Sequence, residues 1–226
     1  MSAAGTRARV RAELTREIAD VARRHLATEG AAALSLRAVA REMGMASSAV
    51  YRYFPSRDDL LTALIVDAYD AIGAAAERAE AEVARDDLRG RWRAACRATR
   101  EWALAHPHEY ALVYGSPVPG YAAPETTIAP AGRVGLLLCR VLADGAAAGT
   151  VPAAPDGEDA GAALAPGVAE EIGVPPALGP RAVMAWSALF GAISFELFGH
   201  TTNVVTDHAA HFESVADRLA DLAGLP

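Results

Sequence analysis

Apolar residues recur at intervals of three and four along the first 75 residues, and this spacing predicts amphipathic helices. A first helix ends at Gly30, and Ser35 is expected to cap a short second helix. Gly44 separates the second helix from a short third one, which ends at Pro55. Residues Ser56 to Asp59 form a capping-box pattern that opens a long fourth helix. The apolar positions of these four helices are Val10, Leu14, Ile18, Val21, Ala22 and Leu26; Leu36, Val39, Ala40 and Met43; Val50 and Phe54; and Leu60, Leu61, Leu64, Ile65, Ala68 and Ile72.

The rest of the chain shows coarser helical patterns, interrupted by proline and glycine. Eleven of the 13 prolines lie between residues 107 and 180, so residues 149–180 are expected to form a long, partly irregular connection. The sequence predicts an all-α fold of about nine helices, with a three-helix N-terminal domain over residues 1–57 and a larger helical bundle over 58–226. The helices expected in the bundle, after the fourth, cover about 88–106, 109–114, 126 to 145 or 149, 160–172, 181–199 and 207–222.

Composition narrows the class of protein. The chain is 52% hydrophobic with two cysteines, which excludes disorder and a disulfide scaffold. All 21 basic residues are arginine, so chemistry that needs a lysine amine is excluded. The N-terminus lacks the apolar core of a signal peptide, and the longest uncharged apolar run in a helical stretch, residues 182–195, is too short to span a bilayer. We therefore expect a cytoplasmic protein without a membrane partner.

Charge divides the chain unevenly. Residues 1–57 hold ten arginines and five acids, a net charge of +5, whereas the other 169 residues have a net charge of −12. A compact basic domain on an acidic body indicates a local anion-binding surface, and nucleic acid is the first candidate.

A helix, a glycine turn and a second short helix form the arrangement that places a recognition helix in the DNA major groove. The segment from Leu34 to Phe54, continued by Pro55 to Leu61, closely resembles the DNA-binding domain of the TetR family over about residues 12–65. The stretch Tyr51-Arg52-Tyr53-Phe54 is specific for that family. One position departs from it, because Ala46 stands where relatives usually have a Ser or Thr cap.

The resemblance and the residue chemistry together suggest a set of DNA contacts. Serine hydroxyls reach base edges or phosphates, tyrosine hydroxyls reach the backbone, and arginines bind phosphate or guanine. Two alternatives stay open: the Tyr51 ring packs against the first helix, and Arg52 is simply solvated. The sequence does not place a possible basic arm of Arg7, Arg9 and Arg11. The expected DNA contacts are Ser35, Arg37, Ser47, Ser48, Tyr51, Arg52, Tyr53 and Arg57.

The segments Trp102–Tyr110 and Ser116–Tyr121 resemble the WHG type of TetR C-terminal domain, frequent in actinobacteria. That resemblance implies that the helices near 181–199 and 207–222 pair with their copies in a homodimer, and that the body holds an effector pocket. The expected dimer contacts are Phe190, Ile193, Leu197, Phe198, Phe212, Val215 and Leu219. The expected pocket residues are Trp92, Cys96, Trp102, Tyr110, Tyr114 and Tyr121, with His106 or His108 as a polar contact and an ordinary aromatic core as the alternative.

Other function classes find less support. The sequence has no G-x-S-x-G, H-E-x-x-H, C-x-x-C or G-x-G-x-x-G motif, so no enzyme and no cofactor site are predicted. The pairs His106/His108 and His208/His211 lack the further ligands of a metal site. A helical ligand-binding or interaction module without DNA binding is the alternative, but the basic N-terminal domain argues against it. We therefore predict a homodimeric, ligand-responsive transcriptional regulator, more specifically a repressor, that binds a near-palindromic operator.

Overall fold

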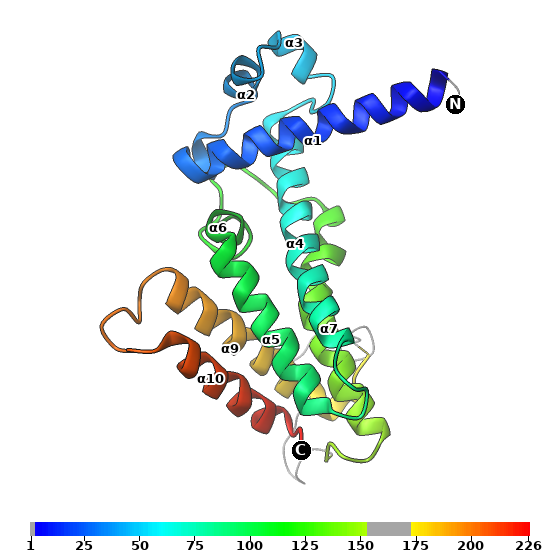
Figure 1. Ribbon diagram of the computed structural model, residues 1–226, viewed down its shortest axis with the longest axis vertical. Coiled ribbons are helices and arrows are strands. Elements are labelled where there is room, and N and C mark those ends of the chain that lie inside the picture. The colour runs from blue at the N-terminus through cyan, green and yellow to red at the C-terminus, as the bar shows by residue number, and fades with distance from the viewer. Residues whose placement is uncertain (1–2, 153–172) are drawn as a thin grey trace. The chain divides into compact units, whose positions relative to one another are not determined.

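The computed structural model describes residues 3–152 and 173–226, and nine α-helices without a strand lie within those residues (Figure 1). The all-α prediction is confirmed, whereas the helix expected around 160–172 falls outside the described residues. The helices are α1 Ala3–Glu29, α2 Leu36–Glu42, α3 Ser47–Val50, α4 Arg57–Ala81, α5 Leu88–Ala105, α6 Pro107–Tyr114, α7 Ile128–Ala147, α9 Gly179–Leu197 and α10 His208–Ala223.

The chain forms two compact units, which we call the head and the body. The head contains the residues up to Ala68 together with His108–Ile128, and the body contains Tyr69–Pro107 and Ala129–Pro226. This division differs from a boundary at residue 57, because α4 continues from one unit into the other and because α6 with its following loop belongs to the head. Leu112, Val118 and Tyr121 pack against the head core, although they lie far along the chain from it.

The head core is built from the apolar faces that the sequence pattern marks. Ile18 and Ala22 of α1, Val39 of α2, and Leu60 of α4 are each 1% exposed or less. Val10 departs from this pattern, since 46% of its surface is exposed. The reason is that α1 starts as early as Ala3 and its first turns extend beyond the core.

Local signals at the helix ends have mixed outcomes. The capping box is confirmed: the Asp59 backbone N–H donates to Ser56 Oγ at 3.1 Å, and Ser56 Oγ donates to Asp59 Oδ2 at 2.7 Å. Ser35 and Ala46 stand at the N-cap positions of α2 and α3, but neither side chain accepts a hydrogen bond there. Ser35 therefore stands at the predicted N-cap position of α2, but its side chain makes no capping hydrogen bond.

In the body, α5 packs beside α9 and α10 (Figure 1). Four arginines recur along one face of α5 and reach acids on the two C-terminal helices, which ties the three helices together. These pairs are Arg89–Asp221, Arg93–Asp217, Arg97–Glu213 and Arg100–Glu196.

A second set of arginines holds α4 against α7 and α5. Arg133 of α7 donates to both carboxylate oxygens of Glu77 and to Asp70 Oδ1, the last at 2.7 Å. Arg91 of α5 is fully buried and binds Glu80 at 2.5 Å and Asp144 at 2.7 Å. A buried charge needs such partners, because an unpaired one is costly to desolvate.

One described helix, Glu125–Ala147, is long and apolar enough to cross a membrane by length and composition alone. A core helix passes the same test, and the buried residues of α7 include Leu137, Leu138, Val141 and Leu142. Arg133 and Arg140 also interrupt this helix. The helix is therefore accounted for as part of the body core.

Candidate nucleic-acid interface

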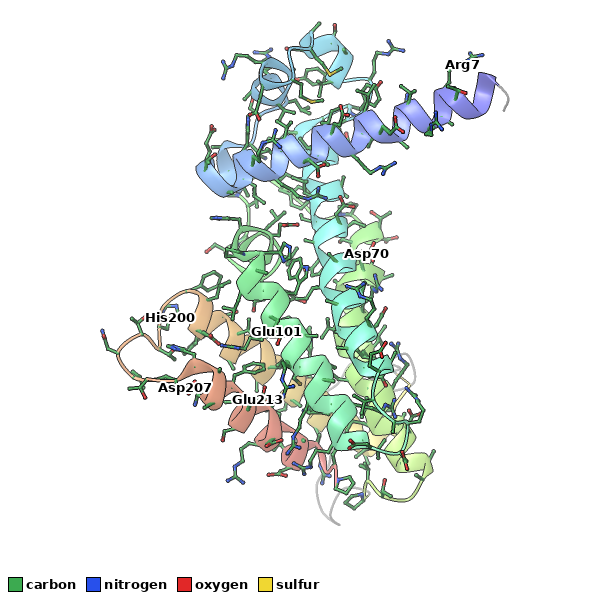
Figure 2. The ribbon with its side chains drawn as sticks, in the orientation of Figure 1. Arg7, Asp70, Glu101, His200, Asp207 and Glu213 are labelled. Atoms are coloured by element: carbon green, nitrogen blue, oxygen red, sulfur yellow. The ribbon has the colours of Figure 1, made fainter. Side chains whose placement is uncertain are left out.

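The α2–turn–α3 segment presents two faces. Leu36, Val39 and Ala40 of α2 and Val50 of α3 are buried in the head core, which fixes both short helices on α1 and α4. The opposite face carries polar and charged side chains that are open to solvent, drawn as sticks in Figure 2. These exposed residues are Arg37, Arg41, Ser48, Tyr51 and Arg52.

The turn that joins the two helices has the geometry of a tight helix end. Gly44 has a φ of 64°, and its N–H donates to the Arg41 carbonyl at 3.2 Å. The next N–H, of Met45, donates to the Ala40 carbonyl at 2.9 Å. These two bonds close α2 and turn the chain toward α3.

The two tyrosines after α3 have different environments. Tyr51 is 41% exposed, so its ring is available to a ligand. Tyr53 is half-buried against the head core, and the Arg11 guanidinium lies 5.3 Å from its ring centroid. The packing against α1 that was an alternative for Tyr51 is therefore made by Tyr53.

Two sets of arginines in the head differ in their partners. Arg9, Arg23 and Arg24 form ion pairs with acids of the head. In contrast, Arg37, Arg41 and Arg52 have no side-chain hydrogen bond or ion pair to any described residue. These three arginines lie on the exposed face of α2 and directly after α3, where they are accessible to a polyanion.

Arg57 has a different role from the one expected of it. Its guanidinium donates to the carbonyls of Leu34 at 3.1 Å, Ala31 at 2.9 Å and Ala32 at 3.2 Å. These bonds tie the start of α4 to the connection between α1 and α2. We do not retain Arg57 as a phosphate contact, because its donors already serve backbone carbonyls. Ser35, half-buried at the start of α2, is not retained either.

Glu42, the last residue of α2, anchors that helix to α1. Arg24 Nη2 lies 2.7 Å from Glu42 Oε1, and His25 Nε2 lies 2.6 Å from Glu42 Oε2. The hydrogen bonds from Arg24 and then from His25 lower the pKa of Glu42. The carboxylate therefore stays charged and holds α2 in place beside the turn.

Arg41 was missed as a candidate contact by sequence reasoning. It lies four residues after Arg37 on the same helix, so both side chains share one face of α2. That spacing is the signal that could have found it.

The expected pocket residues do not fall in one unit. Trp92, Cys96 and Trp102 belong to the body, whereas Tyr110, Tyr114 and Tyr121 belong to the head. Trp92 is fully buried and its Nε1 donates to the Ala216 carbonyl at 3.1 Å. Cys96 is also fully buried, and burial raises the pKa of its thiol.

Three of the remaining aromatic residues also make internal contacts. The rings of Tyr110 and Tyr114 are in tilted contact with centroids 5.0 Å apart, and the Tyr121 hydroxyl lies 2.9 Å from Thr62 Oγ1. Trp102 differs, because it borders a hollow of about 480 Å³ between α4 and α5, beside Arg78 and Glu101. Within the described ranges no three His, Cys, Asp or Glu side chains converge as a metal site would require.

The expected dimer contacts divide by burial. Phe190, Ile193, Phe212 and Leu219 are at most 7% exposed within a single chain, because their stripes pack inside the body. Leu197 and Val215 are half-buried, and only Phe198, at 43%, is well exposed. The large apolar side chains that α9 and α10 expose are Met184, Trp186, Phe195 and Leu222, and the exposed Phe198 directly follows α9.

A glycine turn between two short helices, with exposed arginines on the outer face of the pair, is the arrangement of a helix-turn-helix DNA-binding protein. Comparison with known families agrees. A model of bacterial regulatory proteins of the tetR family matches residues 18–64, and a model of the tetracyclin repressor-like C-terminal domain matches residues 92–219. The chain belongs to the TetR family of transcriptional regulators, which are not enzymes. The WHG subdivision stays a prediction, since the matched C-terminal model is described only in general terms.

Relatives match along nearly the whole chain. The HTH-type transcriptional regulator Rv1816 of Mycobacterium tuberculosis is 38% identical over 223 residues, covering 93% of this chain and 92% of the relative. Among solved structures, putative regulatory protein SCO4313 has 36% identity and a TM-score of 0.72, with 94% of this chain and 98% of that one covered. A Rhodococcus sp. RHA1 protein of unknown function has 26% identity and a TM-score of 0.67, with 93% of each chain covered.

Proposed function

We propose that this chain is a ligand-responsive repressor that binds a near-palindromic DNA operator as a homodimer in the cytoplasm. The observation that supports DNA binding is the position of three exposed arginines of the head that pair with no described residue. Arg37, Arg41 and Arg52 are exposed beside α3, while other arginines of the head, such as Arg23 and Arg24, are neutralised by ion pairs. A surface that keeps its cations unpaired is suited to phosphate.

Within this surface, we assign base reading to the side chains of α3 and its end. Ser47 and Ser48 open α3, and Tyr51 and Arg52 follow it on the exposed side. Arg37 and Arg41 serve the phosphate backbone. The set contains few groups that discriminate bases, so part of the specificity comes from DNA shape and from pairing two half-sites.

Dimerisation is assigned to the outer faces of α9 and α10 rather than to their buried stripes. Met184 and Phe195 of α9 and Leu222 of α10 are 47%, 57% and 40% exposed. Large exposed apolar side chains on neighbouring helices mark an association surface. A two-fold dimer would place two recognition helices on successive half-sites, which accounts for a palindromic operator.

The effector response is assigned to the body. The hollow beside Trp102 combines an aromatic edge with the charged groups of Arg78, Glu82 and Glu101. A ligand that binds one conformation of the body better than another shifts the population toward it. In this proposal the favoured conformation separates the two heads so that they no longer fit both half-sites.

The DNA-binding assignment is tested by Arg37→Ala. Because a lost phosphate contact releases fewer counterions, we expect the slope of log affinity against log salt to fall by about 0.9 for each contact removed. Arg140→Ala is the matched control, since Arg140 is an exposed arginine of the body. The measurement is fluorescence anisotropy of a labelled duplex at several salt concentrations. Equal slopes for both variants and the wild type would remove Arg37 from the interface, and absence of any binding would favour the ligand-binding module without DNA binding.

A further inference from the structure

The connection between α1 and α2 is bound by one side chain from the start of α4. This connection contains a single 3₁₀ turn, Ala31–Ala33. A short helix leaves most of its carbonyls without a partner inside the helix, and an arginine side chain can bind them. The Nε of Arg57 donates to the Leu34 carbonyl at 3.1 Å. Its Nη2 donates to the carbonyls of Ala31 and Ala32, so one guanidinium holds most of the connection.

Arg57 is itself held in a fixed place. It is the first residue of α4, and the Ser56–Asp59 capping box closes that end of the helix. Leu60 and Leu61 follow it, and both are fully buried in the head core. The third guanidinium nitrogen, Nη1, lies 3.6 Å from Asp58 Oδ1. Every nitrogen of the guanidinium is therefore engaged within the head, and the start of α4 is a rigid support for the connection.

Polar contacts anchor α2 at both of its ends. At the C-terminal end, Glu42 binds Arg24 and His25 of α1. At the N-terminal end, Arg57 holds the Leu34 carbonyl, two residues before α2 begins. The apolar contacts of α2 with the core are not directional, whereas hydrogen bonds depend on angle. The two polar anchors therefore set the direction of α2, and the turn after α2 passes this direction on to α3.

We propose that Arg57 is a positioning residue for DNA recognition, which holds the helix-turn-helix in the orientation that base reading requires. This inference rests on the proposed DNA-binding function and adds to it a residue that does not touch DNA. A phosphate charge attracts an arginine over a range of orientations, whereas a base contact depends on hydrogen-bond geometry. Loss of the Arg57 bonds should therefore weaken binding to the operator far more than binding to unrelated DNA.

This position requires the shape of arginine as well as its charge. Two nitrogens of the planar guanidinium serve three carbonyls of the connection. A lysine ammonium keeps the charge, but it is a single point that cannot reproduce this fork. Arg57→Lys should therefore fail to restore operator recognition, whereas lysine would largely restore a contact with phosphate.

The test measures the affinity of Arg57→Ala and Arg57→Lys for two duplexes. One is the duplex that the wild type selects from random-sequence DNA, and the other is a scrambled duplex of the same length. Fluorescence anisotropy at several salt concentrations gives both affinities and their salt slopes. Circular dichroism identifies a temperature at which every variant is fully folded, so that lost stability does not enter the comparison.

Arg23→Ala is the matched control for a lost arginine of the head. The ion pairs of Arg23 are with Asp20, Asp67 and Glu109, so this variant removes polar contacts of the head without changing those of the α1–α2 connection. It should keep the preference of the wild type for the selected duplex over the scrambled one.

We expect Arg57→Ala and Arg57→Lys each to lower the affinity for the selected duplex by about tenfold or more, which is the cost of about one lost base contact. Because no phosphate contact is removed, the salt slopes and the affinity for the scrambled duplex should match those of the wild type. The preference for the selected duplex is the decisive readout, since lost stability alone would not change it in fully folded protein.

Two results would overturn this inference and leave the proposed function standing. A salt slope that falls by about 0.9 for each subunit in Arg57→Ala and is restored in Arg57→Lys would make Arg57 a phosphate contact. A wild-type preference for the selected duplex in both variants would leave Arg57 a structural role alone. A wild type that enriches no duplex would overturn the proposed function itself, and this inference with it.

Discussion

Gly44 determines the angle between α2 and α3, since its φ of 64° lies in the left-handed region that other residues avoid. A Cβ at this position would meet no atom within 4 Å, so backbone conformation alone restricts the position. The DNA contacts proposed for Arg37, Arg41, Tyr51 and Arg52 all depend on the geometry of this turn.

Gly44→Ala is expected to destabilise the head by about 1–2 kcal/mol. The cost arises from the left-handed backbone conformation that alanine must adopt, and steric clashes add nothing to it. Gly44→Asn should cost less, since asparagine tolerates that region better. Urea unfolding followed by circular dichroism measures both free energies. Equal stability of the alanine variant and the wild type would show that the turn relaxes to another conformation.

Single residues were predictable where the cause is local. The glycine turn and the Ser56–Asp59 box follow from neighbours within four positions in the sequence. The contacts of Arg57 do not, because its guanidinium reaches carbonyls 23 to 26 residues earlier in the chain. The Ser35 cap failed for a different reason: its residue type suits the position, but the side chain makes no capping bond.

At the scale of helices, close packing of α4 on α7 depends on a glycine. A Cβ on Gly73 would lie 2.7 Å from Arg133 Cβ and 2.9 Å from Arg133 Nε. Arg133 cannot easily move away, because Glu77 and Asp70 hold its guanidinium. The absence of a side chain at Gly73 therefore lets the two helices approach.

Gly73→Ala is expected to lower the free energy of unfolding by about 1–3 kcal/mol through overpacking. Gly132→Ala in α7 is the matched control, since its Cβ would meet only the Leu136 side chain, at 3.4 Å or more. That variant should gain about 0.5–1 kcal/mol from helix propensity. Chemical denaturation gives both values, and a stabilised Gly73→Ala variant would contradict the packing described for α4 and α7.

The ion pairs between the arginines of α5 and the acids of α10 make stability depend on pH. Hydrogen bonds from Arg97, Arg93 and Arg89 lower the pKa values of Glu213, Asp217 and Asp221 respectively. A carboxyl group with a lowered folded-state pKa adds stability that is complete above its unfolded-state pKa and is lost as pH falls through the folded-state value. The melting temperature should therefore fall between about pH 5 and pH 3.

The variant Arg97→Gln removes one of these ion pairs, the one with Glu213. Glu213 loses its bidentate partner, so its pKa returns toward the ordinary value and the fall in melting temperature at acid pH becomes smaller. Arg37→Gln, which removes an exposed charge of the head, should keep the dependence of the wild type. The measurement is the melting temperature of the three proteins across this pH range. Parallel curves of melting temperature against pH would show that the Arg97–Glu213 pair contributes nothing to the pH dependence.

Helix positions were predictable to within a few residues because apolar spacing and capping residues mark them. The partner that each stripe faces was not. Phe190, Ile193 and Phe212 lie on periodic apolar faces, and periodicity alone does not distinguish a neighbour in the same chain from a second copy. Their burial inside the body could be learned only from the packing of α5, α9 and α10.

At the scale of the whole molecule, charge is distributed unevenly along the chain. The first 57 residues have a net charge of +5 within a chain whose total is −7. The acidic remainder limits indiscriminate binding to nucleic acid, while the exposed arginines of the head keep a local attraction. This asymmetry was visible in the sequence, but which arginines remain unpaired was not, since ion pairing joins residues far apart in the chain.

The most direct test is to select bound duplexes from random-sequence DNA with the purified protein, and then to measure affinity for the selected sequence against salt. The account predicts an enriched inverted repeat, with affinity that falls steeply as salt rises. Failure to enrich any sequence, together with weak binding even at low salt, would contradict it.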